Sequence, residues 1–331
     1  MSKRVAVLTS GGDAPGMNAC LRAIIIGCQR QGFKLIGYKH GFNGLINQEF
    51  IPLSLESTHN LIQYGGTILQ SARCEAFKTP EGAKTAAVNL ANVGIDTLIV
   101  IGGDGSFRGA NHLSQYWDGQ IIGIPGTIDN DIAGTDATIG YYTAIDTAMS
   151  SIDKVRDTAD AFERLFLVEV MGRNAGFLAL NAALSSAADY VIVPEFFDND
   201  KNEISRIVKQ INGQRALKGE VSFIIVVAEN VWPNGLAGLA SALNKHGIKD
   251  VRPVTLGHVQ RGGSPVAQDR LLASSLGNHA VNLVGQAQTN IMVGELNHHV
   301  VSVPLSDTWR KQKPLNDTQV AAMKTQMNER Y

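Results

Sequence analysis

The sequence contains no long apolar run and no cluster of basic residues. Its longest apolar stretches, such as LRAIIIGC, fall far short of the roughly 20 residues that a membrane-spanning helix requires. Lysine and arginine together number 29 against 30 aspartates and glutamates, so the net charge is −1. Proteins that bind nucleic acids or anionic lipids usually carry clustered positive charge. This chain carries no such cluster, so we expect neither a nucleic-acid nor a membrane partner.

Cysteine is also scarce. The chain has only Cys20, Cys28 and Cys74, and no two of them form a Cys-x-x-Cys pair. The N-terminal stretch MSKRVAVLTSGGD has a short apolar run that ends in Gly-Gly-Asp, so we do not expect it to act as a signal peptide. These features predict reduced thiols in a cytoplasmic protein.

Aromatic residues make up only 6% of the chain, whereas glycine is abundant, with 34 residues. Apolar runs recur along the sequence, and most are followed by a Gly-rich turn and then by a helical pattern. Most of these runs are continuous rather than alternating, which is typical of parallel strands buried on both faces. They predict strands at residues 5–9, 97–101, 121–124, 165–170, 190–193 and 223–228.

Parallel strands require crossover connections, so the pattern favours a doubly wound α/β fold. A chain of 331 residues with 44% hydrophobic content is long enough for about two domains. An isoleucine-rich stripe predicts a helix at residues 203–218. Further helices are expected at residues 138–156 and 314–327, and a second domain is expected to begin near Tyr141.

The first Gly-rich turn, LTSGGDAPGMN, follows the first predicted strand. Gly11 and Gly16 have the outer spacing of a Walker phosphate loop, but Met17 and Asn18 stand where that loop has Lys and Ser or Thr. A strand that leads through glycines into a helix still exposes backbone N–H groups that can hold an anion. A tight turn without a ligand is the alternative.

A second turn, IGGDGS, leaves a bare backbone that a triphosphate could approach closely. Asp104 within it offers a carboxylate, and Mg²⁺ on nucleotide phosphates typically uses one or two carboxylates. Arg73, after the glycine pair of YGGTILQSARCE, could supply the positive charge that the first turn lacks. Arg73 alone could equally belong to a surface ion pair.

A third turn, IIGIPGTIDND, presents Thr127, Asp129 and Asp131 directly after a strand. Open α/β sheets bind ligands at the carboxyl ends of their strands. Phosphoryl transfer to a hydroxyl needs a base, Mg²⁺ and cations near the moving group, so Asp129 is a candidate base and Thr127 a candidate substrate contact. A polar turn that caps the next helix is the alternative.

Several basic residues follow or begin other strands, and guanidinium groups match phosphate oxygens well. Each of them alone could be a surface or packing residue. Together they indicate a phosphorylated substrate, whose hydroxyls Glu229 could contact; the basic residues are Arg164, Arg173, Arg252, His258 and Arg261.

The motifs GGDGS, PGTIDND, VEVMGR and LGHVQRGG jointly resemble the bacterial ATP-dependent 6-phosphofructokinases, over nearly the whole chain. The resemblance implies transfer from ATP, with Mg²⁺, to fructose 6-phosphate, giving fructose 1,6-bisphosphate in the committed step of glycolysis. It implies two doubly wound Rossmann-like α/β domains. The nucleotide domain would comprise residues 1–140 and 258–305, and the sugar-phosphate domain residues 141–257 and 306–331.

By this resemblance, Asp129 looks like the general base, Asp104 like the Mg²⁺ ligand, and Arg173 like the group that stabilises the transferring phosphoryl. The implied nucleotide contacts are Gly12, Arg73, Cys74, Gly103, Asp104, Gly105 and Ser106. The implied sugar-phosphate contacts are Thr127, Asp129, Arg164, Met171, Gly172, Arg173, Glu229, Arg252, His258 and Arg261. Arg164 and Arg252 would reach across from a neighbouring subunit, which implies a homotetramer with shared active sites.

Two glycines bear on the phosphoryl donor. The related pyrophosphate-dependent enzymes, which are the alternative, carry an Asp after GGD and a Lys before TIDND. This chain has Gly105 and Gly126 there, which leave room for a nucleotide and favour ATP. Cys74 stands where the family often has an aromatic residue against the nucleotide.

The family's second, inter-subunit site for ADP and phosphoenolpyruvate is altered. Each charged contact of such a site is worth roughly 1–3 kcal/mol, so the loss of three cations predicts a weak or absent response to these effectors. Arg22 and Arg156 match the pattern, Asp189 replaces a Glu, and Ile26, Leu55 and Glu220 stand in place of Arg, Arg and Lys.

Overall fold

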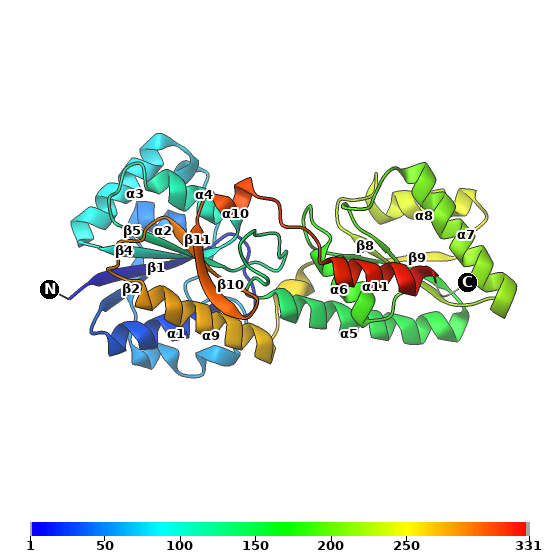
Figure 1. The fold of residues 1–331 in the computed structure, drawn as a ribbon, viewed down its shortest axis with the longest axis horizontal. Coiled ribbons are helices and arrows are strands. Elements are labelled where there is room, and N and C mark those ends of the chain that lie inside the picture. The colour runs from blue at the N-terminus through cyan, green and yellow to red at the C-terminus, as the bar shows by residue number, and fades with distance from the viewer. Residues whose placement is uncertain (1, 329–331) are drawn as a thin grey trace. The chain divides into compact units, whose positions relative to one another are not determined.

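The computed structural model describes residues 2–328, which fold into two compact units (Figure 1). Unit 1 comprises the chain up to Ile128, Ile132–Thr143 and Arg261–Lys313. Unit 2 comprises Asp129–Asp131, Ala144–Gln260 and the chain from Pro314 onward. Each unit is a sheet flanked by helices, so the predicted pair of doubly wound α/β domains is confirmed.

Unit 1 is built on a seven-stranded sheet in the order β11-β10-β5-β4-β1-β2-β3. Its five inner strands are parallel, and β3 and β11 are added antiparallel at the two edges. The strands are β1 (Arg4–Ser10), β2 (Lys34–Tyr38), β3 (Phe50–Pro52), β4 (Thr97–Gly102), β5 (Gln120–Pro125), β10 (Ile291–Leu296) and β11 (His299–Pro304).

Helices cover both faces of this sheet (Figure 1). Helices α1 and α9 pack together over one face, and α2, α3 and α4 lie over the other. Alternate residues of the central strands, including Leu8, Leu98 and Val100, join the core beneath α3 and α4. The helices are α1 (Met17–Arg30), α2 (Phe42–Asn47), α3 (Pro80–Val93), α4 (Asp104–Leu113), α9 (Ala267–Asn282) and α10 (Asp307–Arg310); the short 3-10 helices are η1 (Leu55–Thr58), η2 (Leu61–Gln63) and η3 (Ala76–Lys78).

Unit 2 has a four-stranded parallel sheet in the order β7-β8-β6-β9. Helices α7 and α8 pack on one face through Ile207, Ile211 and Leu239, and α6 and α11 lie on the other. The elements are α5 (Tyr141–Phe162), which begins in unit 1, β6 (Leu165–Val170), α6 (Phe177–Ser185), β7 (Tyr190–Ile192), α7 (Asp200–Lys218), β8 (Phe223–Ala228), α8 (Gly235–Lys245), β9 (Val251–Thr255), η4 (Gly257–Arg261) and α11 (Asp317–Asn328).

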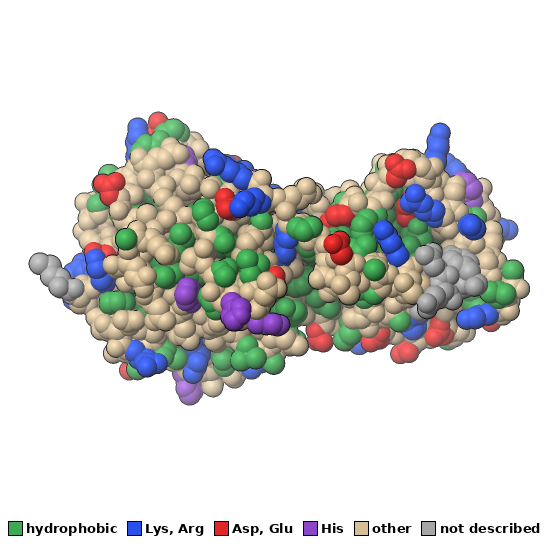
Figure 2. Space-filling view, in the orientation of Figure 1, with side chains coloured by type: hydrophobic (Ala, Val, Ile, Leu, Met, Phe, Trp, Pro, Cys, Tyr) green, Lys and Arg blue, Asp and Glu red, His purple; other side chains and the backbone are tan. Residues whose placement is uncertain are grey.

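The six predicted strands are present as β1, β4, β5, β6, β7 and β8, and the predicted helices correspond to α5, α7 and α11. Helix α5 begins at Tyr141 rather than at residue 138, because Gly140 has a φ of 100°, a left-handed conformation that precedes the helix. On the face drawn in Figure 2, basic and acidic side chains are interspersed over the surface of each unit.

A buried carboxylate fixes the first turn of α5. Asp269 of α9 is 0% exposed, and its side chain accepts hydrogen bonds from Gly140 N (2.8 Å) and Thr143 N (2.7 Å). The Thr143 hydroxyl donates to the same carboxylate and accepts from Val266 N just before α9. Burial raises the pKa of Asp269, and the donated hydrogen bonds oppose that shift. The side chain thus caps α5, whose first turn contains no acidic residue of its own.

We expect Asp269→Asn to lower the free energy of unfolding by about 1–3 kcal/mol, because an amide cannot accept from all of these donors. Urea-induced unfolding, followed by circular dichroism at fixed protein concentration, measures this loss. The exposed Asp118→Asn variant is the control and should change stability by less than about 0.5 kcal/mol. An Asp269→Asn loss no larger than that of the control would contradict the capping role.

Candidate active site

The register of the central strands brings three Gly-rich turns to one edge of the unit 1 sheet. Ser10 of β1 pairs with Gly102 of β4, and Gly102 pairs with Pro125 of β5. The strands are parallel, so the turns that follow them leave from the same, carboxyl, edge. That edge is where open α/β sheets bind their ligands.

The first turn, between β1 and α1, is covered by an arginine. Arg261 Nη1 donates to Asp13 O at 3.1 Å, and a Cβ added to Gly12 would overlap this guanidinium. Gly16, just before α1, has a φ of 112°, which a residue with a side chain rarely adopts. The glycines therefore allow both the close approach of Arg261 and the entry into the helix.

The second turn places Asp104 at the first position of α4, with Gly103 as the N-cap. The Asp104 side chain is 28% exposed, and Arg108 Nε lies 3.6 Å from its Oδ2, one helical turn away. A Cβ added to Gly105 would meet no atom within 4 Å, so the backbone here faces open space. A partly exposed carboxylate at the N-terminus of a helix suits an Mg²⁺ ion that carries nucleotide phosphates.

The third turn lies beside the second. A Cβ on Gly103 would lie 3.7 Å from Thr127 Cβ, and the Thr138 hydroxyl donates to Thr127 O. Thr127 and Asp129 are each 8% exposed, and Asn130 between Asp129 and Asp131 has a positive φ of 54°. The turn is therefore a fixed, mostly buried piece of backbone that starts at the same sheet edge.

Arg73 reaches this edge on an irregular segment. The Ser71 hydroxyl donates to Gly11 O at 2.6 Å, and Asn43 Nδ2 donates to Arg73 O at 3.3 Å. Cys74 is partly buried against the hydrophobic cluster that contains Phe77. The sequence-predicted nucleotide contacts Gly12, Arg73, Cys74, Gly103, Asp104, Gly105 and Ser106 all belong to unit 1.

In unit 2, one carboxylate shapes the turn after β6. Glu229, after β8, accepts hydrogen bonds through Oε1 from Gly172 N (3.2 Å) and Arg173 N (2.5 Å). Gly172 and Arg173 have positive φ values of 144° and 61°. Asn230 Nδ2 also donates to Arg173 O at 3.0 Å. Glu229 therefore holds the backbone that presents Arg173, a contact that the sequence pattern did not reveal.

Gln260 is a second residue that the sequence analysis missed. It is 0% exposed, its Oε1 accepts from Met171 N at 3.4 Å, and its Nε2 donates to Gly257 O at 3.0 Å. Its side chain ties the segment that carries His258 to the turn after β6. The only signal in the sequence is its position inside the LGHVQRGG motif.

Arg164 and Arg252 lie at the other end of the unit 2 sheet. Arg164 precedes β6 and Arg173 follows it, so the six-residue strand separates them by about 20 Å. Arg252, near the start of β9, pairs in register with Phe166 near the start of β6. The Arg164 guanidinium lies 4.2 Å from the Phe162 ring centroid, and Arg252 Nη2 lies 3.5 Å from Asp250 Oδ1. One chain therefore does not bring these two arginines to Arg173.

The residues that match the family's effector site are distributed over both units. Arg22 and Ile26 lie partly buried on α1, and Leu55 of η1 is 49% exposed. Glu220 forms an ion pair with Arg215, with 2.9 Å between Oε2 and Nη2.

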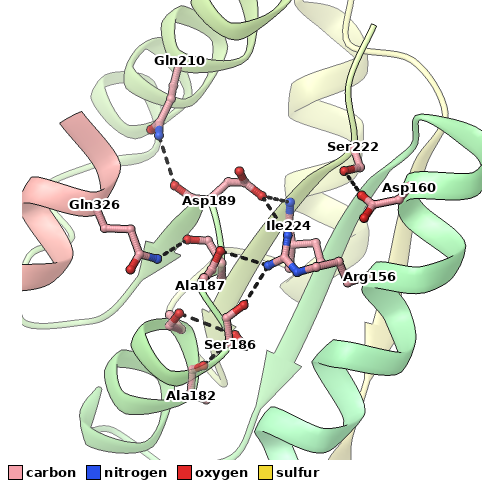
Figure 3. A network of polar contacts seen from close by, with 12 residues as sticks. Arg156, Asp160, Ala182, Ser186, Ala187, Asp189, Gln210, Ser222, Ile224 and Gln326 are labelled. Atoms are coloured by element: carbon pink, nitrogen blue, oxygen red, sulfur yellow. Dashed lines mark hydrogen bonds and ion pairs between the residues drawn. The ribbon is translucent and has the colours of Figure 1, made fainter. Parts of the chain in front are cut away.

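Arg156 is held by its own unit (Figure 3). Its Nη2 donates to Ser186 O (2.9 Å) and Ala187 O (3.0 Å), and its Nη1 lies 3.9 Å from Asp189 Oδ2. Asp189 is buried and also accepts from Ile224 N at 2.8 Å.

Within residues 2–328, no helix has both the length and the apolar character to span a bilayer. In the same range, no three His, Cys, Asp or Glu side chains converge as a metal site. A single carboxylate such as Asp104 fits an ion whose remaining ligands are phosphate and water oxygens.

The sequence model of a family described as phosphofructokinase matches residues 4–284. A Bacteroides thetaiotaomicron protein named ATP-dependent 6-phosphofructokinase 2 is 46% identical over 323 residues, covering 97% of this chain and 98% of that protein. A Thermus thermophilus protein named ATP-dependent 6-phosphofructokinase 1 is 45% identical over 314 residues, covering 95% and 96%.

Solved structures agree. Phosphofructokinase from Saccharomyces cerevisiae superposes with a TM-score of 0.86 at 34% identity, covering 99% of this chain and 47% of that one. A pyrophosphate-dependent phosphofructokinase from Marinobacter aquaeolei superposes with a TM-score of 0.83 at 18% identity, covering 98% and 91%, a likeness of fold alone. The chain belongs to the phosphofructokinase family.

Proposed function

We propose that this protein is an ATP-dependent 6-phosphofructokinase, which transfers the γ-phosphoryl group of ATP to the 1-hydroxyl of fructose 6-phosphate. The observation that carries the proposal is the common edge of the three Gly-rich turns, with Asp104 and Thr127 on adjacent turns. The curated relatives that cover nearly the whole chain carry the same activity in their names. A glycolytic role accords with the cytoplasmic location expected from the sequence.

The nucleotide is assigned to unit 1. Asp104 would hold Mg²⁺, which when bound neutralises charge on the phosphates. The N–H group of Gly105, in the first turn of α4, would donate to a phosphate oxygen. Gly12 and Arg73, from the first turn and the irregular segment, would add further contacts.

Asp129 is assigned as the general base. Its carboxylate would accept the proton of the 1-hydroxyl as that oxygen attacks the γ-phosphorus. Thr127 would hydrogen-bond the substrate, and Arg173 would donate to oxygens of the phosphoryl group in transfer. The positive φ of Arg173 and its tie to Glu229 set the starting point of that side chain. Positioning and charge stabilisation, rather than covalent chemistry, would then supply most of the rate enhancement.

The sugar phosphate is assigned to Met171, Gly172, Arg173, Glu229, His258 and Arg261, together with Arg164 and Arg252 of a neighbouring subunit. The separation of Arg164 and Arg252 from Arg173 along β6 supports this last assignment. Two arginines that the chain cannot bring to its own site would complete the site of another copy. We therefore propose a homotetramer with shared active sites.

ATP is favoured as the donor over pyrophosphate. The open space beyond Gly105 leaves room for the nucleotide. A Cβ on Gly126 would lie 3.0 Å from Ile101 Cγ2 and 3.1 Å from Met17 Cε, so a lysine there would need its neighbours to shift. The pyrophosphate-dependent alternative rests on likenesses of fold at 18% and 19% identity.

We also propose a weak or absent response to ADP and phosphoenolpyruvate. Ile26, Leu55 and Glu220 offer no positive charge to an anion. Arg156 directs one nitrogen to two backbone carbonyls, and Glu220 places a carboxylate where the family has a cation. An effector phosphate would have to compete with groups that are present in every folded chain.

Asp129→Asn should lower kcat by about 10²–10⁴-fold, because the amide cannot accept the hydroxyl proton. The KM for fructose 6-phosphate should change little, because the amide keeps the size and polarity of the side chain. A coupled assay with Mg·ATP measures both constants, and Asp118→Asn on the surface serves as the control. A kcat within tenfold of the wild type would remove Asp129 from the role of base.

Gly105→Asp should reduce kcat/KM for ATP by at least about 100-fold, because a carboxylate beside the triphosphate repels it. Gly105→Ala is the matched control. Its Cβ would enter open space at an ordinary φ, so kcat/KM should stay within about threefold of the wild type. Equal losses in the two variants would show that size rather than charge matters there. Wild-type turnover with pyrophosphate would contradict the donor assignment itself.

Saturation curves for fructose 6-phosphate should be the same, within about twofold, with and without millimolar ADP or phosphoenolpyruvate, given the missing cations. ATP should be kept well above its KM, so that ADP competition at the active site does not appear as regulation. Sigmoidal curves that ADP makes hyperbolic would show that the altered site still works.

A further inference from the structure

The side-chain amide of Asn18 forms hydrogen bonds to the backbone of one loop. It is the second residue of α1, it is 2% exposed, and it stands where a Walker loop would have Ser or Thr. Its Nδ2 donates to Tyr64 O (3.1 Å) and Gly65 O (2.9 Å), and its Oδ1 accepts from Ile68 N (2.9 Å). Both N–H groups and the oxygen of the amide are thus hydrogen-bonded to the backbone of residues 64–68.

That loop belongs to the irregular stretch that carries Arg73. After η2 ends at Gln63, the chain has no helix or strand until η3 begins at Ala76. Its course therefore depends on contacts with neighbouring elements rather than on a hydrogen-bonded ladder. We call residues 64–73 the Arg73 segment.

Other ties hold the Arg73 segment to the first Gly-rich turn. The Thr9 and Thr67 hydroxyls are hydrogen-bonded at 3.0 Å, and the Thr9 hydroxyl donates to Gln70 O at 2.9 Å. The Ser71 hydroxyl reaches Gly11 O. These hydrogen bonds come from the end of β1 and from the first Gly-rich turn. The course of the Arg73 segment therefore depends on the turn that is assigned to the nucleotide.

The beginning of the segment is also closely packed. A Cβ on Gly65 would overlap Gly263 O, and the Ser264 hydroxyl donates to Gln63 O at 2.8 Å. The backbone of Gly65 therefore lies directly against the turn that follows Arg261. Asn18 binds the segment at this crowded end, five to nine residues before Arg73.

We propose that Asn18 is a positioning residue of the nucleotide site. It does not contact ATP. It sets the course of the Arg73 segment against the first Gly-rich turn and so places the Arg73 guanidinium for the phosphates. The inference rests on the proposed function, in which Arg73 contacts the nucleotide, and adds a residue to which no role had been assigned. A misplacement of about 1 Å is enough to lower binding or rate substantially.

The chain offers a matched control in Asn89. It is 6% exposed, lies on α3 in the same unit, and its Nδ2 donates to two consecutive backbone carbonyls, Leu45 O (2.9 Å) and Ile46 O (2.8 Å). Those carbonyls lie at the end of α2, outside the Arg73 segment. Asn→Asp at either position replaces two donors by acceptors that face two carbonyl oxygens, so both variants should lose similar stability.

The test uses the full-length proteins Asn18→Asp and Asn89→Asp and the wild type. Isothermal titration calorimetry with the Mg²⁺ complex of the non-hydrolysable analogue β,γ-imido-ATP measures nucleotide binding. Asn18→Asp should raise the Kd and the KM for ATP by about tenfold while kcat stays within about threefold, and Asn89→Asp should leave the Kd within twofold. A purely structural role would lower the active fraction and kcat without changing the Kd of the folded protein.

Equal Kd values for Asn18→Asp and Asn89→Asp would overturn the proposal, provided that the wild type binds the analogue and uses ATP. If the wild type did neither, the proposed function would fail first, and this inference would fall with it. Should Asn18→Asp not fold, Asn18→Ser replaces it. Failure of Asn18→Ser to fold, where Asn89→Ser folds, would also overturn the proposal, because Asn18 would then serve the core of the unit.

Discussion

The parallel register of β1, β4 and β5 is the constraint on which the candidate site depends. Because Ser10, Gly102 and Pro125 lie level across the sheet, three turns that are far apart in the sequence begin side by side. Packing on both faces fixes this register, since a slip of one residue would move every side chain of a strand to the opposite helical layer and disturb both cores. The positions of Asp104, Thr127 and Asp129 therefore depend on the packing of apolar side chains that take no part in the proposed reaction.

Within this frame, single buried polar side chains organise the irregular backbone. Asn18 binds the loop at residues 64–68, Glu229 binds the turn at Gly172 and Arg173, and Asp269 binds the first turn of α5. In each case a side chain from a helix or a strand end satisfies backbone groups that a loop cannot pair internally. Such groups would be costly if left buried without partners, so each side chain selects one loop conformation.

The sequence predicted β1, β4, β5, β6, β7 and β8 because their apolar runs are continuous, and it located the Gly-rich turns because those runs end there. It did not predict β9, whose sequence VRPVT includes an arginine and a proline and which lies at the edge of its sheet. The edge pairing of β10 with β11 was also missed, because it is set by contacts between strands. Asn18 and Gln260 carried no signal of their own, since an amide that binds distant backbone looks in the sequence like any other polar residue.

Arg156, which matches the pattern of the family's effector site, is paired within its own unit. Arg156 keeps its identity, yet it donates to Ser186 O and Ala187 O and faces the buried Asp189, which in turn accepts from Ile224 N. Those acceptors lie in the connection between α6 and β7, so the guanidinium now stabilises a turn of its own unit. Glu220 forms an ion pair with Arg215. In such a network the carboxylate is present in every molecule at fixed geometry, whereas a free effector would first lose its translational freedom. Under the proposed loss of effector response, this internal pairing would disfavour anion binding at Arg156.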